Sequence, residues 1–226
     1  MKMCRSALIN KLSAHSENLS IIADFDGVLA HDNTKRLLDT CYQVVSRYHS
    51  FDYAIFESMF KALVPCPLSL SVDFLLKSIG LTHIKQELVE AILDVGGDIT
   101  SAMDFVNYCK SANISLYVLS SGHAHAKKYQ FLIEYLGASR VIATTELSKS
   151  NPLDYARVID QTGVDREFCL YIDDCPAALN SAKLAGLNTA MMTNEVFRRT
   201  DIGINASYVD QVFDDWNGAL SFIAEI

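Results

Sequence analysis

The chain has 226 residues, of which half are apolar and a fifth are charged, and its formal net charge is −8. This composition supplies enough apolar side chain for a buried core, and the length fits either one large domain or a core that carries an insertion. Because no basic block stands out in the sequence, a nucleic-acid polymer is excluded as the expected partner.

The cysteines and the apolar runs indicate a cytoplasmic protein that does not span a membrane. The six cysteines form no Cys-x-x-Cys pair and show no metal-ligand spacing with histidine, so we expect reduced thiols in the core. No apolar stretch approaches the length of a membrane span, and residues 1–16 contain no hydrophobic signal core. Lys2, Arg5 and Lys11 would suit a weak targeting presequence, but a frayed or surface helix is the more ordinary interpretation.

The first element in chain order is a buried strand followed by a long helical stretch. Residues 20–25 form a short, apolar, partly β-branched run that is followed at once by Asp-Gly, which is typical of a buried strand that leads into a loop. From there to about residue 99, apolar residues recur every three or four positions in three stripes, over residues 37–48, 56–63 and 84–95. We expect a small helical bundle here, with Tyr48, Phe56, Phe60 and Phe74 in its core.

Strands alternate with helices in the rest of the chain. Strands are expected over residues 114–119, 140–145, 168–172 and 188–193, and helices over 101–111, before Gly137, after Pro152, before Gly186 and over 210–225. This alternation predicts an α/β fold with a doubly wound, Rossmann-like parallel sheet. The predicted core domain comprises residues 1–31 and 98–226, and residues 32–97 form a helical cap inserted after the first strand.

Polar side chains collect just beyond the predicted strands, where ligands bind in such sheets. They are Asp24 and Asp26 after the first strand, Ser120 and Ser121 after the second, Asp173 and Asp174 after the fourth, and Lys149 in a loop before a helix. Asp24 and Asp26 are two residues apart, so their side chains point to one side of a strand. Carboxylates crowded in one place repel one another, and a hard, oxygen-seeking cation such as Mg²⁺ would neutralise them.

Four short segments resemble, in order, the four motifs of the haloacid dehalogenase superfamily. They are DFDGVL (24–29), VLSSG (118–122), KSNP (149–152) and YIDDCP (171–176). The resemblance covers the whole core, and the helical region between the first two motifs is similar in position and size to the α-helical cap of that superfamily's phosphatases and mutases. Each motif alone is weak, whereas four in order at strand ends or helix starts are a strong indication.

The resemblance implies a role for each catalytic group. Asp24 would attack the substrate phosphorus in line and form an aspartyl-phosphate. Asp26 would protonate the leaving oxygen and then take a proton from the hydrolytic water. The dehalogenase branch lacks the second aspartate of the first motif, so Asp26 favours phosphoryl transfer over carbon–halogen cleavage.

The resemblance also implies a Mg²⁺ site and a phosphate site. The Asp24 carboxylate, the Asp26 backbone carbonyl and Asp174 would hold Mg²⁺, with Asp173 in a supporting or water-mediated role. Ser120 and Lys149 would bind the phosphoryl oxygens.

Some positions have competing interpretations. Ser121 competes with Ser120 for the phosphate, or both serines cap the next helix. Lys127 and Lys128 compete with Lys149, but they look like a solvated helix face. The residues after the first motif (His31, Asn33, Lys35 and Arg36) are exposed by default. His123 and His125 are expected at the start of a helix, without a role in the site. Cys175 is expected to be a small space-filling residue close to the metal.

The sequence therefore predicts a capped, Mg²⁺-dependent phosphatase that acts on a small phosphorylated metabolite. A sugar-phosphate mutase would keep all four motifs. A phosphonate hydrolase would need a lysine of the cap (Lys35, Lys61, Lys77 or Lys85) to form a Schiff base. A non-catalytic protein that kept the fold as a binding scaffold is the alternative from a different class.

Overall fold

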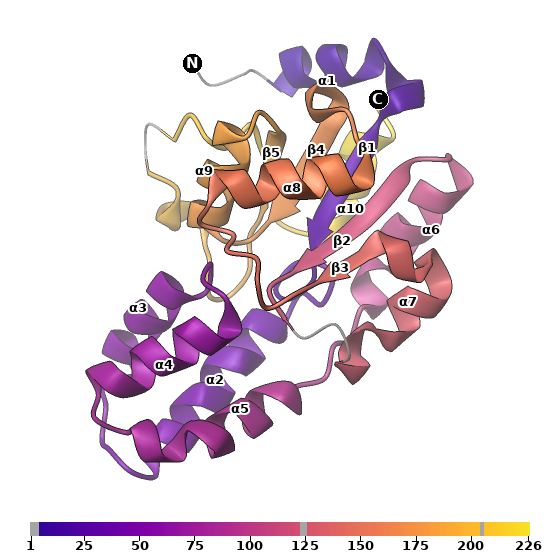
Figure 1. The fold of residues 1–226 in the computed structure, drawn as a ribbon. Helices are drawn as coiled ribbons and strands as arrows, with labels where there is room; N and C mark the ends of the chain where they lie inside the picture. Colours follow the sequence, from indigo (N-terminus) through magenta and orange to yellow (C-terminus); the bar gives the residue numbers. More distant parts are fainter. Residues whose placement is uncertain (1–4, 123–125, 204–205) are drawn as a thin grey trace.

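A six-stranded parallel β-sheet lies at the centre of the computed structural model, which describes residues 5–122, 126–203 and 206–226 (Figure 1). The strands are β1 (Ser20–Asp24), β2 (Ser115–Ser120), β3 (Val141–Ala143), β4 (Cys169–Asp173), β5 (Asn188–Met192) and β6 (Gln211–Phe213). Their order across the sheet is β3-β2-β1-β4-β5-β6. The connections change direction between β1 and β4, which makes the carboxyl ends of these two strands the expected ligand site.

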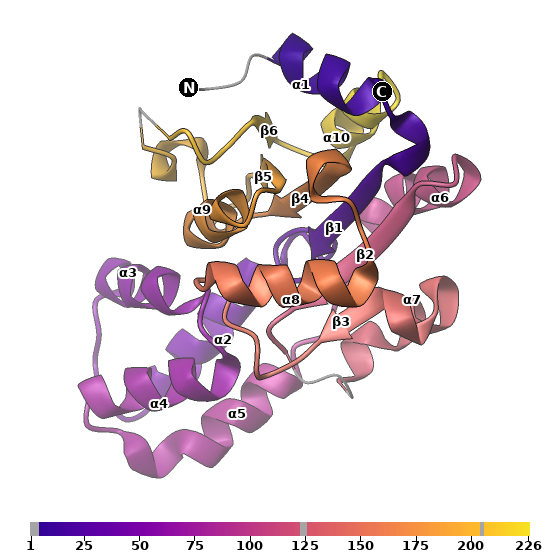
Figure 2. The same cartoon turned by 45° about the horizontal axis from the view of Figure 1, so that its top comes forward.

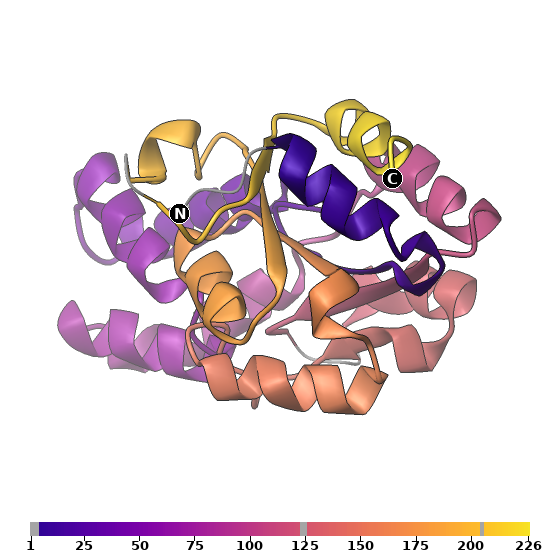
Figure 3. The same ribbon diagram turned by 90° about the horizontal axis from the view of Figure 1, so that it is seen from above.

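Helices cover both faces of the sheet (Figures 2 and 3). Helices α8 (Pro152–Thr162) and α9 (Pro176–Leu184) cover one face, and α1 (Arg5–Ser13), α6 (Met103–Ser111), α7 (Gln130–Leu136) and α10 (Trp216–Ile223) cover the other. Successive side chains of β1 enter opposite cores, because Ile22 packs with α8 and α9 whereas Ile21 and Ala23 pack with the other group. The doubly wound α/β fold expected from the sequence is confirmed.

The strand register aligns the predicted site residues at one edge of the sheet. Ala23 of β1 pairs with Ile172 of β4, so Asp24 and Asp173 are the next residues of these two strands. Asp24 also pairs with Leu119 of β2, the residue before Ser120. Every residue of β1 and β4 is buried, as expected for strands covered on both faces.

Four helices between β1 and α6 form a group of their own beyond the carboxyl edge of the sheet (Figure 1). These cap helices are α2 (Asn33–Ser46), α3 (Tyr53–Leu63), α4 (Leu68–Ser78) and α5 (Lys85–Leu93). Each of α2 and α4 packs against both α3 and α5. The three apolar stripes seen in the sequence correspond to α2, α3 and α5. The boundaries proposed for core and cap, at residues 31/32 and 97/98, stay a prediction.

The expectations for the two ends of the chain were wrong in part. Residues 210–225 form β6 and then α10, not one helix. Strand β6 has only three residues, which is too few to show the alternation of apolar and polar residues that identifies a strand in a sequence. Its position in the sheet follows from pairing with β5, where Phe213 pairs with Met192. At the other end, the frayed or surface helix expected from the sequence is a surface helix, α1, and it is not frayed, since Leu8 and Leu12 are fully buried against the sheet and Lys11 donates to Asn188 (3.0 Å).

The cysteines follow the sequence expectation in the described part of the chain. The five described cysteines are free, and four of them are buried. Within the described ranges, no helix combines the length and the apolar character needed to cross a membrane.

Candidate active site

A tight loop after β1 carries two carboxylates beyond the edge of the sheet. The N–H of Gly27 donates to the carbonyl of Ala30 (2.9 Å), which closes the loop. Gly27 has φ +83°, a conformation that favours glycine, and a Cβ at this position would collide with the Asp174 carboxylate. Asp24 is thereby fixed at the strand end, with Asp26 two residues further on.

Lys149 makes a buried ion pair with Asp24. Its Nζ lies 2.5 Å from Oδ1 of Asp24 and 3.0 Å from Oδ2 of Asp173, and all three side chains are nearly inaccessible to solvent. The loop that carries Lys149 leads into α8, where the Asn151 side chain caps the helix and Pro152 occupies its first turn. The structure therefore brings the third motif to the first, as the sequence predicted.

The two acids at the carboxyl end of β4, Asp173 and Asp174, are held by different partners. Asp173 Oδ1 accepts the backbone N–H of Cys175 (2.7 Å). Asp174 Oδ2 accepts from the Thr34 hydroxyl (2.8 Å) and the Asn194 amide (2.7 Å). Burial raises the pKa of the Cys175 thiol, which keeps it protonated and suits the space-filling role expected from the sequence. Thr34 and Asn194 are site residues that the sequence analysis missed.

Three carboxylates form a group with the geometry of a cation site. One oxygen from each of Asp24, Asp173 and Asp174 lies within 4.8 Å of the others. The second oxygen of Asp174, Oδ1, is buried and has no hydrogen-bond partner among the described residues. A buried oxygen left without a donor is costly, and a hard cation such as Mg²⁺ would satisfy it. The donor set therefore fits Mg²⁺.

The electrostatics of the group favour the same conclusion. Burial raises the pKa of Asp24 to about 7, with the charge of Lys149 acting in the opposite direction and those of Asp173 and Asp26 adding to the rise. Burial and the neighbouring carboxylates also raise the pKa of Asp174 well above its usual range. Burial lowers the pKa of Lys149, but Asp173 and Asp24 outweigh it and raise that pKa well above normal. One lysine does not balance the acids, whereas a divalent cation would.

Asp26 is held by a lysine that the sequence analysis had assigned to a solvated helix face. Lys128 Nζ lies 2.8 Å from Oδ1 and 2.6 Å from Oδ2 of Asp26, and the lysine side chain is only 11% exposed. Asn33, at the start of α2, donates to Oδ1 of Asp26 as well (2.7 Å). The solvated interpretation is therefore wrong for Lys128, although Lys127 is exposed. Asp26 thus contacts both the core and the first cap helix.

The two serines after β2 differ in their hydrogen bonds. Ser120 is buried, and its Oγ lies 2.7 Å from the Tyr129 hydroxyl. Ser121 has a buried Oγ for which the described residues supply no partner. Both serines face the same cavity as Asp24. Either hydroxyl could bind a phosphoryl oxygen, so the preference for Ser120 stays a prediction.

Other residues considered in the sequence lie away from these groups or outside the described part of the chain. Lys35 forms an ion pair with Asp39 on the same helix (2.5 Å), and Arg36 is exposed, as expected by default. His123 and His125 lie outside the described residues.

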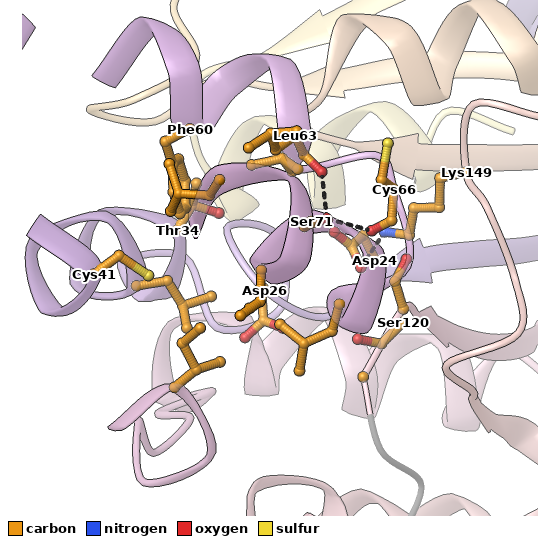
Figure 4. Close-up of a pocket in the computed structure, with 18 of the residues that line it drawn as sticks. Asp24, Asp26, Thr34, Cys41, Phe60, Leu63, Cys66, Ser71, Ser120 and Lys149 are labelled. Carbon is orange, nitrogen blue, oxygen red and sulfur yellow. Dashed lines mark hydrogen bonds and ion pairs between the residues drawn. The ribbon is translucent and has the colours of Figure 1, made fainter. Parts of the chain in front are cut away.

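A cavity of about 150 Å³ connects the carboxylates to the cap helices (Figure 4). Asp24, Ser120 and Lys149 line its core end. Its cap end is lined by side chains from all four cap helices, among them Cys41 and Phe60. A group bound in this cavity would touch the catalytic residues and the cap at once.

The family comparison agrees with the motifs. The family model of haloacid dehalogenase-like hydrolases matches residues 19–186, which is most of the chain. No curated protein matches the sequence.

Several solved structures share the fold. A protein assigned as a beta-phosphoglucomutase from Bacteroides vulgatus has a TM-score of 0.70 at 15% identity, covering 98% of this chain and 95% of its own. CbbY from Rhodobacter sphaeroides, in complex with xylulose-(1,5)bisphosphate, has a TM-score of 0.65 at 17% identity, covering 87% and 94%. The L-2-haloacid dehalogenase RSc1362 has a TM-score of 0.61 at 12% identity, covering 91% and 98%. At these identities the likeness concerns the fold alone.

Proposed function

Because the chain belongs to the family of haloacid dehalogenase-like hydrolases, we propose that it is a Mg²⁺-dependent phosphatase that hydrolyses a phosphate monoester through an aspartyl-phosphate on Asp24. The observation that carries the proposal is the arrangement around Asp24. Its carboxylate lines the core end of a cavity, is paired with Lys149, is grouped with Asp173 and Asp174, and lies two residues from Asp26.

The first half of the reaction transfers the phosphoryl group to the protein. An Asp24 oxygen forms a bond to phosphorus while the bond from phosphorus to the alcohol oxygen breaks. Asp26 gives its proton to that leaving oxygen. Lys149 offsets the negative charge that Asp24 and the phosphoryl oxygens bring together, and the serine hydroxyls donate to those oxygens.

The second half returns the protein to its starting state. Asp26, now a carboxylate, takes a proton from water as that water attacks phosphorus. The bond between phosphorus and Asp24 breaks, and inorganic phosphate leaves. Asp24, the Asp26 carbonyl and Asp174 would hold Mg²⁺, which would supply neutralising charge for the phosphoryl oxygens.

The alternatives kept open by the sequence are less well supported. Phosphonate cleavage would need a lysine of the cap to form a Schiff base with the substrate, but none of the four lysines of the cap helices is among the described residues that line the cavity. Asp26 is present, which argues against dehalogenation. A mutase remains the main enzymatic competitor, because it uses the same groups and returns the phosphoryl group to the substrate. CbbY has also been solved in complex with phosphate, which fits a phosphate-binding role for this fold.

The proposal is tested by phosphate release from a panel of small phosphate monoesters in the presence of Mg²⁺. Asp24→Asn keeps the shape of the side chain and removes the attacking carboxylate. We expect the wild type to release phosphate, EDTA to abolish the release and Asp24→Asn to be inactive. An Asp24→Asn variant as active as the wild type would overturn the assignment, and activity that depends on a bisphosphate activator would favour the mutase.

A further inference from the structure

The cavity beside Asp24 is apolar on its cap side. Its lining there includes Cys41 of α2, Phe60 and Leu63 of α3, Leu75 of α4 and Leu88 of α5. In Figure 4, Phe60 and Cys41 lie on the side of the cavity opposite Ser120 and Lys149. The part of a substrate that extends away from the phosphoryl group therefore meets hydrocarbon and thiol.

The two hydroxyl groups on this side already have partners. The Ser71 hydroxyl lies within hydrogen-bond distance of three backbone carbonyls of the cap, those of Leu63 (2.9 Å), Pro67 (3.1 Å) and Cys66 (3.2 Å). The Thr34 hydroxyl donates to Asp174. Neither has a proton free to donate to a substrate hydroxyl.

The charged side chains of the cap helices are not part of the cavity lining. Lys35 pairs with Asp39, and Lys61 pairs with Glu57 (3.1 Å). No acidic or basic side chain from the cap helices is found among the described residues that line the cavity. Among the described residues, the charged groups that line the cavity all come from its core end.

We propose that this site takes the phosphate monoester of an apolar alcohol or phenol, whose hydrocarbon part occupies the cap side of the cavity. The proposal rests on the phosphatase function above. The whole cavity of about 150 Å³ is close to the volume that holds benzene, and the phosphoryl group takes its core end, so the hydrocarbon part that fits on the apolar cap side is a small one. Each CH₂ buried there improves binding about fourfold, which corresponds to about 0.8 kcal/mol.

A sugar phosphate fits this cavity poorly. Each sugar hydroxyl that enters it loses hydrogen bonds to water and finds no free hydrogen-bond donor among the described side chains on the cap side, which weakens binding about tenfold or more per hydroxyl. The apolar lining therefore separates this chain from a sugar-phosphate enzyme, although the folds are alike.

The test compares substrates that differ only in the part that enters the cavity. Methyl, propyl and hexyl phosphate have similar leaving groups, so their kcat/KM values report the burial of the chain. Propyl phosphate and glycerol phosphate share a three-carbon chain and differ by two hydroxyls. We expect kcat/KM to rise about fourfold per CH₂ until the cavity is filled. Propyl phosphate should be the better substrate of the pair by about a hundredfold, which is about tenfold for each of the two hydroxyls.

A pair of matched variants links the preference to the cavity. Phe60→Ser places a hydroxyl in the lining, whereas Phe74→Ser makes the same change on α4 at a side chain that is 67% exposed and not part of the lining. We expect Phe60→Ser to flatten the dependence of kcat/KM on chain length and Phe74→Ser to leave it unchanged. The wild-type series alone decides the matter if Phe60→Ser fails to fold.

The outcomes separate the two proposals. Hydrolysis of the esters with no gain along the alkyl series, or with a preference for glycerol phosphate, overturns this inference and leaves the phosphatase function standing. Failure of the wild type to release phosphate from any ester, with Mg²⁺ present, overturns both. A rise along the series that Phe60→Ser removes and Phe74→Ser keeps supports the apolar substrate.

Discussion

Replacing Lys149 with methionine should destabilise the fold in a way that depends on pH and on Mg²⁺. Methionine has a similar length and no charge, so the change mainly removes the cation. Lys149 Nζ contacts both Asp24 (2.5 Å) and Asp173 (3.0 Å), and the three side chains are buried. Removing one partner from a buried ion pair costs about 3–5 kcal/mol because the remaining charge is left uncompensated.

The loss of unfolding free energy in Lys149→Met should be largest at a pH above the pKa of Asp24. That pKa is raised by burial to about 7, so near pH 8 Asp24 is ionised and relies on Lys149. Near pH 5.5 Asp24 carries a proton, and the same substitution leaves less uncompensated charge. Mg²⁺ at about 100 times its Kd should raise the free energy of unfolding of Lys149→Met by about 2.7 kcal/mol, because the ion neutralises the carboxylates in place of Lys149.

Chemical unfolding of the wild type and Lys149→Met, at both pH values and with or without Mg²⁺, measures these differences. Lys183→Met is the matched control, since Lys183 Nζ lies 2.5 Å from Asp210, whose side chain is only 3% exposed. Asp210 is not in the carboxylate group, so this variant should lose stability without responding to Mg²⁺. An equal loss for Lys149→Met at both pH values, unaffected by Mg²⁺, would refute the reasoning.

Three further predictions concern the same site. The pKa of Asp24 is raised from an ordinary 3.8 to about 7, so this carboxyl contributes stability that is complete below about pH 4 and is lost as the pH rises through about 7. The rise in Tm caused by Mg²⁺ should therefore be larger near pH 8 than near pH 5.5. Equal shifts in Tm at the two pH values, measured by differential scanning fluorimetry, would contradict this. Gly27→Ala should abolish the Mg²⁺-dependent rise in Tm because its Cβ would collide with the Asp174 carboxylate of the cation site. Gly137→Ala, also at positive φ but with nothing within 4 Å, should cost about 1–3 kcal/mol of backbone strain and keep the rise. Ser121→Ala should raise KM and leave Tm unchanged, because the Ser121 hydroxyl has no partner among the described residues. Ser120→Ala should raise KM and also lower Tm, because it leaves the buried Tyr129 hydroxyl without its partner. A lower Tm in Ser121→Ala together with a normal KM would contradict this.

The sequence was sufficient for the fold and for the residues at the strand ends. A parallel sheet brings the carboxyl ends of its strands to one edge, so the acids after β1 and β4 and the serines after β2 could be grouped without coordinates. Lys149 was found through its motif, and the structure brings it to Asp24.

The residues that the sequence analysis missed come from contacts between distant elements. Lys128 reaches Asp26 across 102 positions, and Thr34 reaches Asp174 across 140, with no motif that relates them. The helical period also failed to show which cap aromatics are buried, since Phe74 is 67% exposed and Tyr48 is 47% exposed. An apolar stripe predicts a buried face, but not every aromatic residue on a helix belongs to that face.

The central claim is that Asp24 carries the phosphoryl group during turnover. The direct measurement is an acid quench of the protein with Mg²⁺ and a phosphate ester that it hydrolyses, followed by mass spectrometry of the peptides. The account predicts the added mass of one phosphoryl group on the peptide that contains Asp24, and its absence in Asp24→Asn. Turnover without a phosphorylated peptide, or the same modification in Asp24→Asn, would contradict it.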